Sequence, residues 1–180
     1  MYRWLAWIVV ALLAAFLASG CGGGDDENSA TAWADDVCSA ATTWRDSITS
    51  TTESLSSGGN LSENALTSAV DDIQSATSDF VDDVRGLGAP DTESGEQAKE
   101  SLDQLADAAD ESLSSIQSAV DDVSGVNGVV QAVTAISAAI ATIGTQVSST
   151  VAELKQLDAG GELEAAFNEA DSCKELQSGG

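Results

Sequence analysis

A strict alternation of four- and three-residue steps between core-type positions runs through the middle of this sequence. These positions are Leu66, Val70, Ile73, Thr77, Phe80, Val84 and Leu87. A mean spacing of about 3.5 residues keeps one side of an α-helix facing a neighbouring helix along its length. No alternating pattern typical of a β-strand extends over a useful length, so we expect an all-α fold.

Segments rich in Gly, Ser and Asp, one with the single Pro, interrupt the helical periodicity at 56–60, 86–91, 124–128 and 158–161. The helices predicted between these breaks span 30–55, 62–86, 93–123, 128–157 and 161–176. Short connections favour antiparallel neighbours. The sequence therefore predicts one domain at 30–177, an up-down antiparallel bundle of four long helices with a short C-terminal helix.

The first 20 residues have the plan of a secretory signal peptide. Arg3 precedes an uncharged, mostly apolar stretch at 4–18 that leads into small residues. This stretch is shorter than the ~20 residues that a membrane-spanning helix needs.

The segment at 17–21, Leu-Ala-Ser-Gly-Cys, resembles the lipobox of bacterial lipoproteins. That resemblance implies cleavage before Cys21 and a diacylglyceryl group on its side chain. Residues 21–29 would then be a lipidated cysteine and a flexible acidic tether. The alternative is ordinary cleavage, which leaves a soluble secreted chain with an odd thiol.

Two further cysteines, Cys38 and Cys173, lie near the two ends of the predicted domain. In an exported chain we expect them to form a disulfide, with two buried free thiols as the alternative. If the last helix runs parallel to the first, Cys38 lies about 12 Å and Cys173 about 18 Å along their helices. The predicted topology and the predicted disulfide therefore support each other.

Residues 123–152 contain no charged side chain, in a chain with 30 Asp and Glu against 6 Lys and Arg. The first interpretation is a helix at the centre of the bundle, contacted on several sides. A membrane-inserting segment and a groove for an apolar ligand are the alternatives.

The composition excludes several classes of chemistry. Without histidine there is no Ser-His-Asp or Cys-His catalysis and no His-ligated zinc. A net charge of −24 argues against binding to nucleic-acid phosphates. Acidic clusters such as Asp79 with Asp82 and Asp83 are interpreted as a solvated face, with weak binding of divalent cations as the alternative. We expect no catalytic residues, no metal site and no cofactor.

Trp33 and Trp44 lie eleven residues apart, almost in line on one face of the first predicted helix. The simpler interpretation makes them large core residues. If partly exposed, they would be natural anchors of a protein–protein interface.

The whole pattern resembles the small helical lipoproteins of high-GC Gram-positive bacteria. No diagnostic motif follows Cys21 in this sequence, so the resemblance implies no particular activity. We therefore expect a non-enzymatic interaction or scaffold module, anchored through Cys21 to the extracytoplasmic face of the cell membrane, with an envelope protein as candidate partner. The alternatives are a carrier of a small apolar or lipid ligand and a pore-forming protein. The sequence does not fix the oligomeric state.

Overall fold

The computed structural model describes residues 29–57, 62–121, 123, 125–157 and 160–178. The predicted signal peptide at 1–20 and Cys21 lie outside the described residues, as does the tether up to residue 28.

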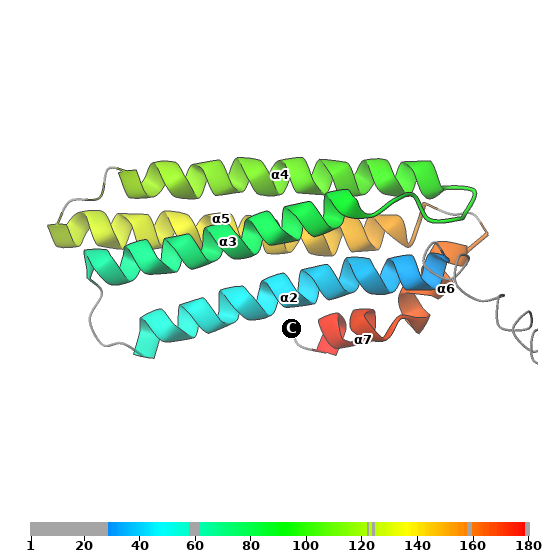
Figure 1. The fold of residues 1–180 in the computed structure, drawn as a ribbon, viewed down its shortest axis with the longest axis horizontal. Helices are drawn as coiled ribbons and strands as arrows, with labels where there is room; N and C mark the ends of the chain where they lie inside the picture. Colours follow the sequence, from blue (N-terminus) through cyan, green and yellow to red (C-terminus); the bar gives the residue numbers. More distant parts are fainter. Residues whose placement is uncertain (1–28, 58–61, 122, 124, 158–159, 179–180) are drawn as a thin grey trace, which may run out of the picture.

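The described chain is all-α, with four long helices followed by two short ones, as predicted apart from one split (Figure 1). The helices are α2 (Ala30–Ser57), α3 (Glu63–Gly86), α4 (Gly95–Asp121), α5 (Gly125–Leu154), α6 (Glu162–Glu169) and α7 (Asp171–Ser178). Successive long helices run in opposite directions, so the up-down topology is confirmed.

The helix ends follow local chemistry. Ser62 caps α3, because its hydroxyl oxygen accepts a hydrogen bond from the Ala65 N–H at 3.2 Å. At the start of α4 the chain passes so close to Pro90 that a Cβ on Gly95 would lie 2.1 Å from the Pro90 carbonyl oxygen. Glycine, which has no Cβ, is therefore required at the first residue of α4.

One core runs through the bundle. Six of the seven positions in the strict 4-3 series of α3 are buried, and Leu87 is partly buried. The largest fully buried aliphatic side chains come from four helices, α3 to α6: Leu66, Leu102, Ile116, Ile143, Leu154 and Leu163. The core is thus mainly aliphatic, with four aromatic side chains, Trp33, Trp44, Phe80 and Phe167.

Two expectations need correction. The predicted C-terminal helix at 161–176 breaks at Ala170, whose ψ of 128° leaves the helical region. The break lets α6 cover the start of α2 while α7 runs alongside α2. The uncharged segment at 123–152 does not lie at the centre of the bundle: α5 packs along α4, has a short contact with α3, and exposes a broad face.

Candidate interaction surface and the C-terminal arm

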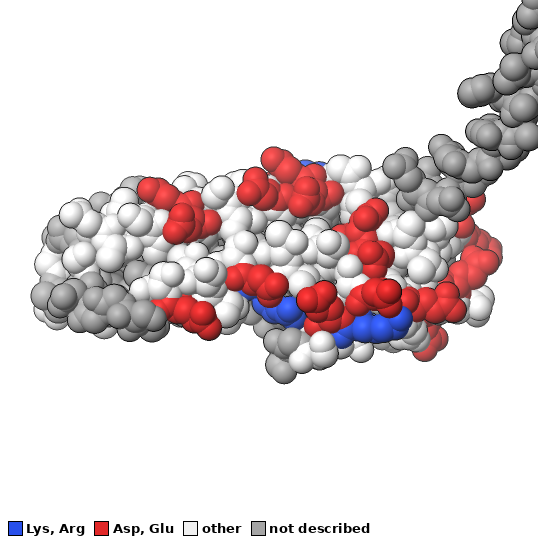
Figure 2. All heavy atoms as spheres, turned by 60° about the horizontal axis from the view of Figure 1, so that its bottom comes forward, with Lys and Arg blue, Asp and Glu red and all other residues white. Residues whose placement is uncertain are grey.

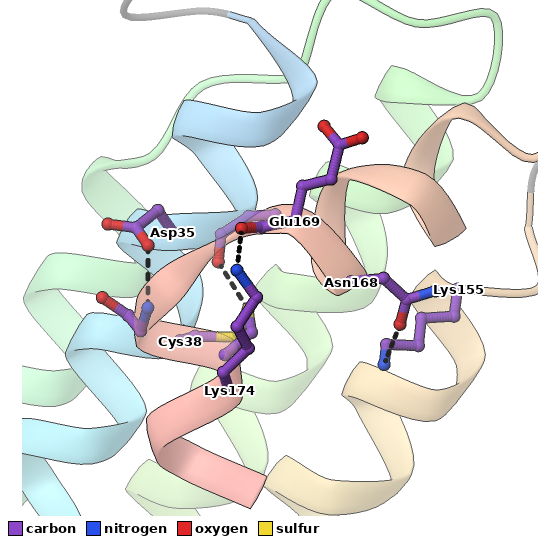
Figure 3. Close-up of a disulfide and its surroundings, with 9 residues drawn as sticks. Asp35, Cys38, Lys155, Asn168, Glu169 and Lys174 are labelled. Carbon is purple, nitrogen blue, oxygen red and sulfur yellow. Dashed lines mark hydrogen bonds between the residues drawn. A yellow bond between two sulfur atoms is a disulfide. The ribbon is translucent and has the colours of Figure 1, made fainter.

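The C-terminal arm, α6 with α7, is joined covalently to α2. Cys38 and Cys173, which are 135 positions apart in sequence, form a disulfide with Cα atoms 4.9 Å apart (Figure 3). Both cysteines are fully buried. The predicted pairing is therefore confirmed, and it ties the two ends of the domain together.

Side chains of α2 hold both ends of α7. The Ser172 N–H at the start of α7 donates to Asp35 Oδ1 at 2.9 Å, and Arg45 Nη1 donates to the Leu176 carbonyl oxygen at 3.0 Å. These groups satisfy backbone atoms that a short helix leaves unpaired. The earlier residue of α7, Ser172, contacts the earlier residue of α2, Asp35, and the later residue, Leu176, contacts the later one, Arg45. Helix α7 therefore runs parallel to α2, as predicted.

Lys174 holds the turn between α6 and α7. Its ammonium donates to the Glu169 carbonyl oxygen at 2.7 Å (Figure 3). It also donates to Asp171 Oδ1 at 2.8 Å. The hydrogen bond from Lys174, with the attraction of its charge, lowers the pKa of the Asp171 carboxyl. This pair therefore stabilises the fold above the ordinary pKa of aspartate, and that stability is lost as the pH falls through the lowered pKa.

Trp33 and Trp44 are core residues, 2% and 6% exposed. Trp33 Nε1 donates to the Gly88 carbonyl oxygen at 2.8 Å, and its ring meets Phe167 edge to face with centroids 6.0 Å apart. Trp44 Nε1 donates to Thr77 Oγ1 at 3.2 Å. The candidate interface at Trp33 and Trp44 is therefore wrong for the folded domain, because both rings and both indole N–H groups are already used inside it.

The outer face of α5 exposes no charged side chain from Asn127 to Ala152. Among the described residues, Asn127–Leu154 is also the one stretch that could cross a membrane by length and composition, and only 28% of its most apolar part is buried. Burial inside the bundle therefore does not explain why this helix lacks charged side chains over most of its length.

The exposed positions of α5 contain a second series with alternating four- and three-residue steps, which we call the outer seam. It consists of Asn127, Gln131, Thr134, Ala138, Ala141, Thr145, Ser148 and Ala152, all exposed and none charged. Such spacing places these side chains along one line that faces away from the core. The seam could have been found in the sequence, but its exposure could not, because the apolar seam of the same helix dominates the pattern.

The hydroxyl groups of the outer seam are turned back onto the helix. The hydroxyls of Thr134, Thr145 and Ser148 each donate to the carbonyl oxygen four residues earlier, at 2.8–2.9 Å. Their hydrogen-bond donors are thereby satisfied without an outside partner. The seam can consequently approach an uncharged surface without leaving these donors unpaired.

Most of the exposed Asp and Glu side chains lie on the other helices. Figure 2 shows one face on which Asp and Glu side chains are spread along most of the length, with few Lys and Arg between them. An open groove of about 670 Å³ between α2 and α3 is bordered by Asp46, Asp72 and Asp79. The outer seam thus differs in charge from the α2–α3 side of the same molecule.

The acidic clusters form ion pairs where a cation is near. Arg85 Nη2 on α3 lies 2.8 Å from Asp107 Oδ1 and 2.7 Å from Asp110 Oδ2 on α4. These two hydrogen bonds raise the pKa of the Arg85 guanidinium. Within the described part of the chain, no three His, Cys, Asp or Glu side chains are grouped so as to hold a metal ion.

Comparison with known proteins adds no relative: no family model, no curated protein and no solved structure matches this chain.

Proposed function

We propose that this protein is a lipid-anchored, extracytoplasmic interaction module of the cell envelope that binds its partner through the outer seam of α5. The exposure of this uncharged seam on a molecule of net charge −24 carries the proposal. Exposed apolar surface that is not used by the fold itself often marks an interaction site, and the seam exposes three alanines among uncharged polar side chains.

The position of the tether fits this role. Helix α2 begins at Ala30, nine residues after Cys21, so the folded domain starts within about 30 Å of the lipidated residue. Helix α5 ends at the same end of the bundle at which α2 begins (Figure 1). With the bundle upright on the membrane, the outer seam extends away from the bilayer and stays accessible from the side.

The packing supports an interaction module over a ligand carrier. The space between the long helices is filled by fully buried side chains such as Leu102, Ile116 and Ile143. The groove of about 250 Å³ between α4 and α5 is open to solvent and lined mostly by polar residues, including Gln104 and Gln146. Such a groove suits surface contact better than enclosure of an apolar ligand.

Mass spectrometry of the protein purified from cell membranes tests the anchor. We expect a chain that begins at Cys21, carries a diacylglyceryl group and has the Cys38–Cys173 disulfide. The Cys21→Ser variant should lose the lipid and leave the membrane fraction after signal-peptide cleavage, or stay uncleaved. A wild-type chain that begins elsewhere and carries no lipid would contradict lipid anchoring.

Chemical crosslinking in intact cells tests the surface. The variant Ala138→Asp with Ala141→Asp places two charges on the outer seam, and we expect it to lose the crosslinked complex of the wild-type protein. The matched control, Ser115→Asp with Ser118→Asp, adds the same charges at exposed positions of α4 with the same spacing. Equal crosslinking in both variants would show that binding uses another surface.

A further inference from the structure

We infer that the partner on the outer seam is a second copy of this chain, with the two α5 helices side by side and pointing in the same direction. This inference rests on the proposed function and names the partner that the proposal leaves open. Charge, shape and the reach of the tether carry it.

The charge distribution restricts where two copies can meet. Two molecules of charge −24 repel each other most where their acidic side chains approach, and α2, α3, α4 and the C-terminal arm all expose Asp or Glu. Facing like charges disfavour a complex strongly. Pairing through the outer seam keeps uncharged residues at the contact from Asn127 to Ala152, and the one charged residue of α5, Glu153, lies at its C-terminal end.

The shape of the seam suits a helix–helix contact. Five of its eight positions are Ala or Thr, one is Ser, and the two longer side chains, Asn127 and Gln131, lie together near the start of α5. Small side chains let helix axes approach to the short end of the usual 8–10 Å range. A two-fold axis parallel to α5 brings each position of the seam opposite its own copy, so the surface is self-complementary.

The tether sets the direction. Helix α5 is about 45 Å long, whereas the nine residues from Cys21 to Ala30 reach at most about 30 Å. In an upright antiparallel pair, one domain would begin about 45 Å farther from the membrane than the other, beyond the reach of its own tether. Two copies anchored upright in one membrane therefore pair in the same direction.

The contact area indicates a weak pair that depends on the membrane. The seam from Asn127 to Ala152 is about 39 Å long, and a helix face about 10 Å wide gives about 800 Å² for both copies. Stable complexes generally bury about 1,200–2,000 Å². Anchoring in one membrane supplies the high local concentration that such a contact needs.

Site-specific photo-crosslinking of the full chain in membranes tests the inference. We would replace Gln131 on the outer seam by p-benzoylphenylalanine and, as the matched control, replace Gln117 on α4, which is also exposed. The residue at 131 should give a product of twice the protein mass, at least about tenfold more than the residue at 117. Ala138→Asp with Ala141→Asp should lower that yield at least about tenfold.

Two cysteine variants, Gln131→Cys and Ser148→Cys, test the direction with a short bismaleimide. Pairing in the same direction predicts that each variant crosslinks to itself. Crosslinking only when the two variants are mixed would overturn it, because an antiparallel pair brings 131 opposite 148. Mass spectrometry of the same samples determines whether Cys21 carries a lipid.

Two other products of photo-crosslinking at 131 would overturn the second copy as partner. Capture of a different protein that Ala138→Asp with Ala141→Asp abolishes would leave the proposed interaction surface standing. Capture of lipid would remove both the second copy and the protein–protein function of the seam. A lipid-free chain with an intact pair would refute the anchor and, with it, the dependence of the pair on the membrane.

Discussion

The disulfide between Cys38 and Cys173 joins the first and last helices across 135 positions of sequence. In the chain-entropy model, a loop of this length is stabilised by up to about 5 kcal/mol through restriction of the unfolded state. We predict that Cys38→Ser with Cys173→Ser lowers the free energy of unfolding by about 2–5 kcal/mol in urea titrations. The reduced wild-type protein should match the variant, and an unchanged denaturation midpoint would contradict this prediction.

Trp44 and Thr77 form a polar contact inside the core. Trp44 Nε1 donates to Thr77 Oγ1 at 3.2 Å, and Thr77 is fully buried. A double-mutant cycle with Trp44→Phe and Thr77→Val should give a coupling energy of about 1 kcal/mol, because either change alone leaves a buried group unpaired. Strictly additive effects on the free energy of unfolding would show that the hydrogen bond contributes nothing.

At the level of the helix, α5 has an inner and an outer side with different roles. Ile143 is fully buried, whereas Ala141 belongs to the exposed outer seam. We predict that Ile143→Ala lowers the free energy of unfolding by about 2–5 kcal/mol, and that Ala141→Ser changes it by at most about 0.5 kcal/mol. Thermal denaturation of the two variants measures these changes in the free energy of unfolding. A large loss of stability for Ala141→Ser would mean that the outer seam is packed within its own fold.

The sequence allowed the four long helices to be predicted to within about three residues, because their apolar periodicity and their breakers agree. The disulfide followed from the number of cysteines and the parallel run of the last helix. The break at Ala170 could not be predicted, because Asp35 and Arg45 on α2 hold α7 from more than 130 positions away in sequence. The exposure of the outer seam was missed for a related reason: periodicity shows which side of α5 is apolar but not how many helices surround it.

The whole molecule carries a net charge of −24, and its compact state places these charges closer together than the unfolded chain does. Added salt screens this repulsion, since the Debye length falls from about 30 Å at 0.01 M to about 3 Å at 1 M ionic strength. We predict that the melting temperature rises by a few degrees between low and high NaCl, since about 1 kcal/mol corresponds to 2–4 °C at this size. KCl should act equally, and a melting temperature that stays flat or falls would contradict the prediction.

The same charge distribution leaves the outer seam of α5 as the uncharged side of an acidic, tethered bundle. The most direct test is labelling by a membrane-impermeant maleimide of full-length Ala141→Cys, with Ser118→Cys on α4 as the exposed control. If a partner covers the seam, position 141 should be protected in native membranes and become reactive in dilute detergent, while position 118 reacts in both. Equal reactivity of the two positions in native membranes would show that nothing covers the outer seam.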